Sequence, residues 1–260
     1  MVLSLTQTVL AVASGSFVGF ALGLVGGGGS ILAVPLLIYV VGVQDPHVAI
    51  GTSAVAVALN AMANLTVHAH AGNVKWRCAT VFAVAGVAGA FLGSPLGKMM
   101  DGQKLLALFA SLMMVVGALM LRDRARTGDT GVRLSRENLP YLLGLGLAAG
   151  AVSGFFGIGG GFLIVPALTL ATGMQMLNAI GSSLLSVTAF GLTTAGNYAW
   201  SGLVDWPLAG LFVTGGLVGG LLGARSARSL ADRKGALTTV FAVLIFAVAL
   251  YMLVRSLNLI

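Results

Sequence analysis

Charged residues are scarce in this chain of 260 residues. Asp, Glu, Lys and Arg together make up 8% of the sequence, hydrophobic residues make up 58%, and the mean hydropathy is +1.01. A typical soluble domain carries about 25% charged residues, so the composition excludes an ordinary soluble domain. Apolar stretches follow one another with little between them, which is the pattern of membrane-spanning helices. The sequence therefore predicts an all-α polytopic membrane protein.

Several signatures of chemistry are also missing. The single cysteine, Cys78, excludes an internal disulfide and a cysteine metal cluster. Carboxylates stay out of the apolar segments, which excludes a proton relay of buried acids. Nucleophile–base pairs, His-Glu-x-x-His motifs and Gly-x-x-x-x-Gly-Lys-Ser/Thr phosphate loops are absent from the sequence. We therefore expect no enzyme activity and no cofactor.

The net charge of +7 does not indicate nucleic acid as a partner. The basic residues are confined to short loops between apolar segments, where they act first as an orientation signal in the membrane. The first residues, Met1 to Leu5, lack the basic region of a secretory signal. We therefore expect the first apolar stretch to stay as a membrane segment.

One short glycine-rich pattern is present twice. The first copy is Gly23–Pro35 (GLVGGGGSILAVP) and the second is Gly154–Pro166 (GFFGIGGGFLIVP). Each glycine costs a helix about 1 kcal/mol relative to alanine, so the run predicts a break. Bare N–H groups at such a break, followed by the positive end of a helix dipole, favour an anion. Close packing of helices on small residues is the alternative and stays open here.

The rest of the chain repeats in the same order. Gly23 pairs with Gly154 at an offset of 131 residues, and Ala49–Ser53 pairs with Ala179–Ser183 at an offset of 130. Apolar segments are expected at about 8–25, 30–43, 48–68, 78–97 and 104–121, and again at about 139–156, 160–173, 178–200, 207–224 and 236–254. Each repeat is thus predicted to be a Gly-broken helical hairpin plus three transmembrane helices. The domains are 1–121, a cytoplasmic Arg-rich linker 122–138, and 139–260.

Loop charges predict that the two repeats are inverted. If each hairpin returns to its starting side, eleven basic residues share one face and three, Lys98, Lys104 and Arg255, lie on the other. If each glycine pattern instead lies within a single membrane span, eight basic residues fall on one face and six on the other. The positive-inside rule favours the first arrangement, with the linker in the cytoplasm and both termini outside. Inversion would bring the two hairpin tips together near the bilayer midplane, where transporters with inverted repeats place substrate.

Polar side chains recur at helical spacing after each hairpin, and with the tips they form the candidate binding site for a small anion. The tip residues are Gly26, Gly27, Gly28, Gly29, Ser30, Gly157, Gly159, Gly160 and Gly161, and the stripe residues are Thr52, Ser53, Asn60, Asn64, Ser182, Ser183, Ser186, Thr193, Thr194 and Asn197. Hydrogen bonding between helices is an equally good explanation for any one stripe residue. His47, His68 and His70 lie near segment ends, where interfacial solvation explains them, and Trp76, Trp200 and Trp206 are expected as interfacial anchors.

The paired glycine patterns ending in Val-Pro resemble those of the sulfite exporter TauE/SafE family. The motifs Ala-Ile-Gly-Thr-Ser and Ala-Ile-Gly-Ser-Ser and the Gly-x-Val-x-Trp neighbourhoods extend the resemblance from about Leu10 to Leu253. It implies a multi-pass inner-membrane transporter for sulfite, sulfoacetate or related organosulfonates, a family commonly described with about eight membrane segments. The first copy has Gly27 and Ser30 where the second has Ile158 and Gly161, so the two tips need not contribute equally.

These observations predict a secondary transporter that works by alternating access around an anion held at the tips. An anion channel and a non-transporting scaffold that recruits partners through the Arg-rich linker are the alternatives. The expected partners are a small anionic substrate and the lipid bilayer, and a homo-oligomer is left open.

Overall fold

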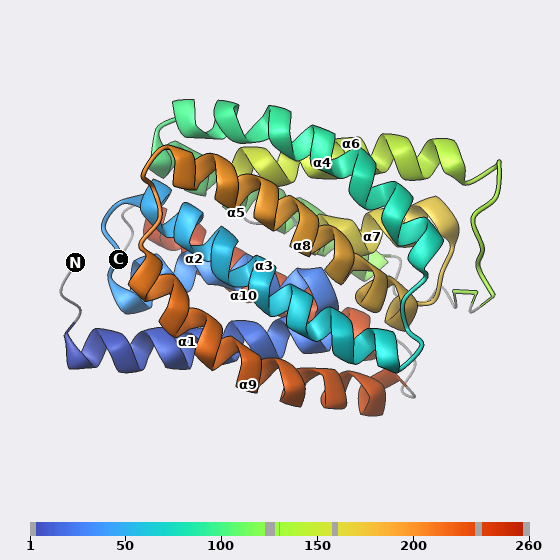
Figure 1. Ribbon diagram of the computed structural model, residues 1–260, viewed down its shortest axis with the longest axis horizontal. Helices are drawn as coiled ribbons and strands as arrows, with labels where there is room; N and C mark the ends of the chain where they lie inside the picture. The colour runs from blue at the N-terminus through green and yellow to red at the C-terminus, as the bar shows by residue number, and fades with distance from the viewer. Residues whose placement is uncertain (1–3, 123–127, 130, 158–160, 232–235, 257–260) are drawn as a thin grey trace.

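The computed structural model describes residues 4–122, 128–129, 131–157, 161–231 and 236–256, and their regular structure is helical apart from one isolated bridge between Asp129 and Met174 (Figure 1). The elements are α1 (Leu5–Val25), the 3-10 helix η1 (Gly26–Leu32), α2 (Ala33–Leu36), the π-helix η2 (Leu37–Val41), α3 (Pro46–His70), α4 (Trp76–Met99), α5 (Gly102–Arg122), α6 (Leu139–Phe156), α7 (Gly161–Thr172), α8 (Met176–Trp200), α9 (Trp206–Ala231) and α10 (Ala236–Ser256).

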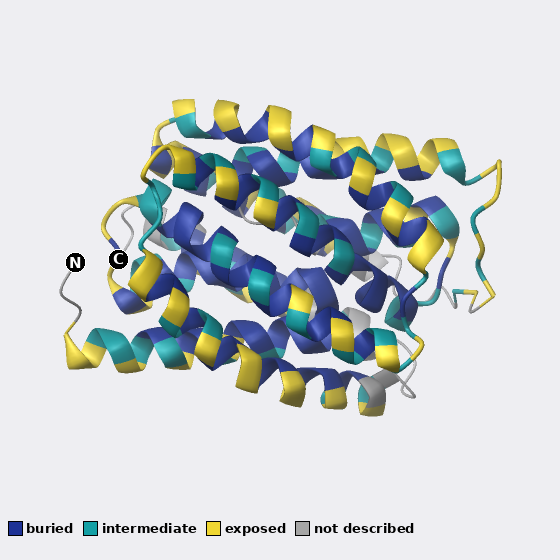
Figure 2. Cartoon of the chain, viewed as in Figure 1, coloured by how far each residue is buried: buried dark blue, intermediate teal, exposed yellow. Residues whose placement is uncertain are grey.

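Six helical stretches in the described part of the chain are long and apolar enough to cross a membrane. They are Leu5–Val41, Pro46–His70, Trp76–Met99, Leu139–Phe156, Met176–Trp200 and Trp206–Ala227. Large apolar side chains such as Phe91 and Leu92 of α4 and Val218 and Leu222 of α9 are exposed. Exposed residues lie along the outer faces of the bundle (Figure 2). Such a surface suits hydrocarbon as the surrounding solvent. The prediction of an all-helical polytopic membrane protein is confirmed.

Local sequence sets where the helices begin and end. Ser4 and Gln7 form a capping box at the start of α1, and Asp45 caps α3, whose first residue is Pro46. At the other end of α1 the chain adopts a positive φ of 66° at Gly26, and α6 ends on Gly157 in the left-handed region. Both positions favour glycine because a Cβ is strained there. The predicted breaks at the glycine patterns are therefore confirmed.

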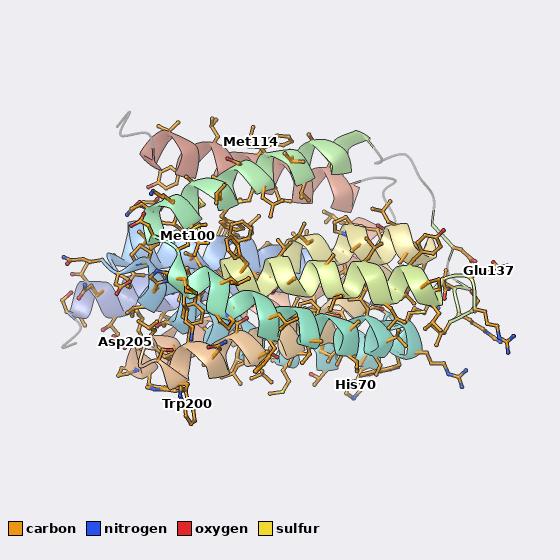
Figure 3. The ribbon with its side chains drawn as sticks, turned by 90° about the horizontal axis from the view of Figure 1, so that it is seen from above. His70, Met100, Met114, Glu137, Trp200 and Asp205 are labelled. Carbon is orange, nitrogen blue, oxygen red and sulfur yellow. The ribbon has the colours of Figure 1, made fainter. Side chains whose placement is uncertain are left out.

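The bundle has two ends, which we call end A and end B. Helix α3 runs from end A to end B, and α8 runs the other way, because Gly51 near the start of α3 packs on Leu203 just beyond α8. At end B, Gly181 near the start of α8 packs on Asn73 just beyond α3. Helix α1 begins and α10 ends towards end A (Figure 1), which is the side of Trp200 and Asp205 in Figure 3, whereas Glu137 of the linker lies at end B.

Helices of one half pack against helices of the other along glycine seams. A Cβ placed on Gly19 of α1 would overlap the carbonyl oxygen of Gly216 of α9, and one placed on Gly150 of α6 would overlap that of Gly86 of α4. Glycines later in α1 contact residues later in α9, and the same order holds for α4 and α6. The two helices of each pair therefore run parallel. The absence of side chains lets the backbones approach closely, as small residues do in membranes.

Helices α3 and α8 form the centre of the bundle and make matching contacts. The Thr52 hydroxyl accepts a hydrogen bond from the backbone N–H of Asp205 at 2.9 Å, and the Ser182 hydroxyl accepts one from the N–H of Lys75 at 2.9 Å. Each residue of one bond lies 130 positions from its counterpart in the other. Both bonds tie the connection after one central helix to the first turns of the other.

Candidate functional site

The first hairpin tip lies against the start of α8, near end B. All of η1 is buried, and the N–H of Gly27 donates to Oγ of Ser183 at 3.0 Å. The Ser30 hydroxyl donates to the carbonyl of Gly27 at 2.8 Å. The run from Gly26 through Ser30, Gly28 and Gly29 included, forms a 3-10 helix at the predicted break. One of its N–H groups is already bonded to Ser183.

The second tip lies near end A. Gly157 donates its N–H to the carbonyl of Ser153 at 2.9 Å and packs against Ile50 of α3. A Cβ placed on Gly157 would lie 3.5 Å from the hydroxyl oxygen of Tyr198. Of the other predicted residues, Gly159 and Gly160 lie outside the described part of the chain, and Gly161 begins α7.

The expectation that the two tips meet near the bilayer midplane is wrong. The first tip contacts α8 at Ser183 and the second contacts it at Tyr198, fifteen residues further on, or about 22 Å along the helix axis. The reason is the length of the helices that lead into the tips. Helix α1 has 21 residues and α6 has 18, so they rise about 32 and 27 Å and reach the far end of the bundle before the chain turns.

The polar stripes divide into two groups. Thr52, Ser182 and Ser183 accept hydrogen bonds from backbone N–H groups of distant segments, as described above, and Ser53 donates to the carbonyl of Ile50 at 2.8 Å. Hydrogen bonding that holds the fold explains these four residues, although the sequence places them in the binding site. Thr52, Ser182 and Ser183 tie the loops, the first tip and the central helices to one another, whereas the Ser53 bond stays within α3.

The second group has buried polar atoms without a hydrogen-bond partner among the described residues. Asn60 is fully buried, lies against Gly216 of α9, and both its amide nitrogen and its carbonyl oxygen are unpaired. The Asn64 side-chain oxygen and the Thr194 hydroxyl are likewise unpaired. The hydroxyl of the stripe residue Ser186 is unpaired too, and Ser94 of α4 and Ser153 of α6 add unpaired hydroxyls outside the stripes. Unpaired buried polar groups are unfavourable, which marks them as candidates for contact with a ligand or water.

A polar cluster at end A contains Asn197 of the predicted site together with Lys98, Tyr198 and Ser201, which the sequence does not place in it. Nζ of Lys98, at the end of α4, donates to the side-chain oxygen of Asn197, to its carbonyl at 3.2 Å and to Oγ of Ser201 at 2.8 Å. Nζ also lies 5.8 Å from the centre of the Tyr198 ring. From sequence alone, Lys98 is interpreted only as part of the charge pattern that orients the protein in the membrane. Arg228, also a basic residue, occupies the equivalent position in the second half. This repetition was the sequence feature that could have marked Lys98 as a candidate site residue.

Two of the three histidines differ from the interfacial expectation. His68 is buried, and its Nε2 lies 3.0 Å from the carbonyl oxygen of Gly23. Nε2 of His47 lies 3.1 Å from the carbonyl oxygen of Met100, and its ring centre is 6.4 Å from that of Tyr198. His70 is exposed, as are Trp76, Trp200 and Trp206 at the helix ends, where the aromatic belt places tryptophan.

Comparison with known proteins identifies the family. The profile described as "Sulfite exporter TauE/SafE" matches residues 11–252, nearly the whole chain. The chain belongs to the TauE/SafE family. A relative from Xylella fastidiosa named "Probable membrane transporter protein" is 53% identical over 98% of both chains. YunE of Bacillus subtilis, also named a probable membrane transporter protein, is 28% identical over 85% of this chain and 89% of its own. No solved structure matches significantly.

Membership of the TauE/SafE family confirms that the chain is a membrane transporter homologue and not an enzyme. It also places the protein in a lipid bilayer as a multi-pass protein. The relatives' printed names give no substrate.

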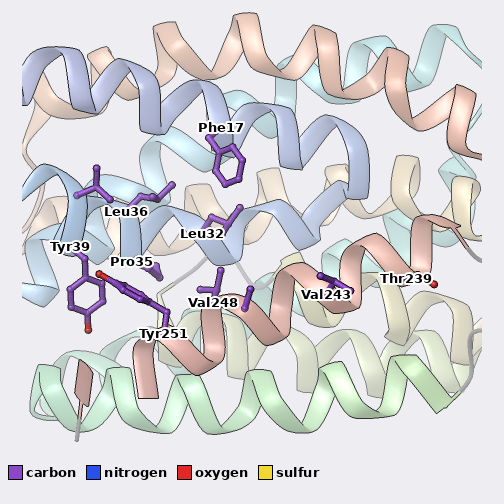
Figure 4. Close-up of a pocket in the computed structure, with 11 residues that line it drawn as sticks. Phe17, Leu32, Pro35, Leu36, Tyr39, Thr239, Val243, Val248 and Tyr251 are labelled. Atoms are coloured by element: carbon purple, nitrogen blue, oxygen red, sulfur yellow. The ribbon is translucent and has the colours of Figure 1, made fainter. Parts of the chain in front are cut away.

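An apolar groove on this TauE/SafE protein contains none of the predicted site residues. It has a volume of about 790 Å³ and lies between the first hairpin and α10 (Figure 4). Phe17, Leu32 and Pro35 line one wall, Val243 lines the other, and Tyr39 and Tyr251 meet edge to face at one end with ring centres 5.3 Å apart. An anion has no polar partner along most of this groove, so we place the candidate site at the polar groups of the central helices.

Proposed function

We propose that this protein is a secondary transporter that moves small sulfur-containing anions, such as sulfite or organosulfonates, across the inner membrane by alternating access. Family membership supports transport, and the sulfur in the substrate comes from the family's description. The binding site in this proposal consists of the unpaired polar groups of α3 and α8, with the first tip on its end B side and the second tip on its end A side. Neutral amides and hydroxyls can replace part of the hydration shell of an oxyanion and still release it.

The proposal includes two inverted repeats. The observation that carries it is the exchange of partners between the halves: α1 lies along α9, and its counterpart α6 lies along α4. Counterpart contacts at an offset of 130 residues, such as Thr52–Asp205 and Ser182–Lys75, follow the same relationship. Because α3 and α8 run in opposite directions, a two-fold axis in the membrane plane relates the halves in this proposal. Transporters with that symmetry expose one site alternately to each side.

The orientation in the membrane follows from the basic residues. End B has Lys75 and Arg77 at the start of α4, and the linker connects α5 and α6 at the same end. We therefore propose that end B faces the cytoplasm and that both termini lie outside.

The test is anion binding and flux with purified protein. Thermal unfolding in detergent with sulfite, sulfate, thiosulfate, sulfoacetate, taurine, acetate and chloride is expected to show selective stabilisation by a sulfur oxyanion. Gly28→Val in the buried first tip is expected to abolish flux into proteoliposomes while the protein still reaches the membrane. Gly144→Val is the matched control, because nothing lies within 4 Å of a Cβ at Gly144 of α6. Full flux in Gly28→Val contradicts a role for the first tip in transport.

Two further measurements separate the alternatives. Flux through a channel neither saturates with anion concentration nor shows counterflow, whereas flux through a transporter saturates and shows counterflow. A scaffold loses its function when residues 127–133 of the linker are deleted, whereas a transporter stays largely active.

A further inference from the structure

We propose that a small oxyanion binds at end A, beside the second tip, between Nζ of Lys98 and the hydroxyl of Tyr198. This inference rests on the proposed transport of anions and deepens it, because it assigns the site to one end of the molecule and to residues outside the glycine patterns.

Lys98 supplies a positive charge that no carboxylate among the described residues neutralises. Its three hydrogen-bond partners are the side-chain and backbone oxygens of Asn197 and the hydroxyl of Ser201, all of them neutral. The carboxylates of end A are bonded elsewhere: Oδ1 of Asp45, Asp101 and Asp205 accept from the backbone N–H groups of His47, Lys104 and Leu208, respectively. A half-buried ammonium surrounded by neutral acceptors attracts an anion.

Tyr198 supplies a hydrogen-bond donor that has no acceptor. Its side chain is fully buried, and its hydroxyl has no partner in the described part of the chain. The hydroxyl points at the second tip, 3.5 Å from the position of a Cβ at Gly157. A buried hydroxyl normally has a hydrogen-bond partner, so an acceptor on the ligand would satisfy this one. The Lys98 ammonium lies over the ring of the same tyrosine, which brings the charge and the hydroxyl to one side chain.

His47 of α3 lies beside Tyr198, with ring centres 6.4 Å apart, but is not counted as a donor to the anion. Its Nε2 faces the carbonyl oxygen of Met100, so Nε2 carries the proton in the neutral ring. The buried and unpaired Nδ1 is then an acceptor and cannot donate to an oxyanion.

Among the described side chains, the first tip has no equivalent of the Tyr198 hydroxyl. The position equivalent to Tyr198 is His68, whose Nε2 already faces the carbonyl of Gly23. Asn197 and Ser201 correspond to Val67 and Ala71, which have no side-chain oxygens. The N–H of Gly27 is bonded to Ser183. The first tip is thus closed by its own protein contacts, whereas at the second tip a charge and a hydroxyl are left for a ligand.

The experiment measures anion affinity of the full-length protein with single substitutions. Sodium sulfite and sodium sulfoacetate are the probes, with sodium chloride as the ionic control. Tyr198→Phe removes only the unpaired hydroxyl, so we expect the same unfolding temperature without anion and a dissociation constant raised about tenfold, or about 1.4 kcal/mol. Tyr141→Phe at the exposed start of α6 is the matched control and is expected to bind as the native protein does.

Lys98→Gln and Lys98→Arg test the charge. Lys98 also holds the last turn of α8, so Lys98→Gln is expected to lower the unfolding temperature as well as the affinity. Lys98→Arg keeps the charge and is expected to retain anion-induced stabilisation. Unchanged affinity in both Tyr198→Phe and Lys98→Gln overturns the site while leaving the transport proposal intact, provided that the native protein binds the probe. If the native protein neither binds nor transports any sulfur anion, the proposed function fails and this site fails with it.

Discussion

The backbone N–H of Gly27 donates a hydrogen bond at 3.0 Å to Oγ of Ser183, which lies 156 residues away in the sequence. The same Oγ donates to the carbonyl of Ile180 at 2.7 Å, so Ser183 joins the first tip to α8. Ser183→Ala leaves the buried N–H without its acceptor. We expect the free energy of unfolding to fall by about 1–3 kcal/mol, measured by thermal or denaturant unfolding in detergent. Ser111→Ala on the exposed face of α5 is the control, and an equal effect of both substitutions contradicts the prediction.

The glycine seams give a second prediction. Gly150→Ala is expected to force α6 away from Gly86 of α4 and to lower the free energy of unfolding by about 1–3 kcal/mol. Gly144→Ala in the same helix meets open space and is expected to be neutral or to stabilise by up to about 1 kcal/mol. Unfolding curves of the two variants make the comparison. Equal stabilities would show that the seam tolerates a side chain.

Asn60 allows function and stability to be separated. Both polar atoms of its side chain are buried and unpaired, so Asn60→Leu removes an unfavourable group and is expected to leave the unfolding temperature unchanged or higher. Anion flux is expected to fall, because the amide is a candidate ligand. Asn64→Leu is the companion variant: its Nδ2 donates to the carbonyl of Asn60 at 2.9 Å, so it is expected to lose stability too. A large loss of stability in Asn60→Leu contradicts a ligand-binding role.

The proposed orientation is tested by cysteine labelling. In a Cys78→Ser background, which removes the buried native thiol, Gln103→Cys reports on end A and Arg133→Cys on end B. A membrane-impermeant maleimide is expected to label Gln103→Cys in spheroplasts, and Arg133→Cys only after the membrane is opened. The reverse pattern would invert the topology.

Helix positions were predictable because long apolar runs and their breaks are local properties. The segment expected at 48–68 is α3, Pro46–His70, and the one expected at 78–97 is α4, Trp76–Met99. The glycine break was predictable too, because Gly26 and Gly157 adopt a positive φ that other residues avoid.

The partner of each helix was not predictable from a single sequence. Gly15, Gly19 and Gly23 of α1 indicate a close neighbour, but nothing in their spacing says that this neighbour is α9 of the other half. The depth of each tip depends on whether α1 and α6 cross most of the bundle before the chain turns. A difference of a few residues in where these helices begin changes that depth. Lys98 and Tyr198 are 100 residues apart in the sequence, so their proximity can be seen only in the folded structure.

The pairing of α1 with α9 also fixes an order of events during synthesis. Gly19 leaves the ribosome 197 residues before Gly216, which at elongation rates of about 5–20 residues per second is about 10–40 s. Throughout that interval the small-residue face of α1 is in the membrane without its final neighbour. A nascent chain that stops after the linker therefore leaves α1 unpaired, and α4 likewise waits for α6. Neither half can complete its packing until the other has been inserted.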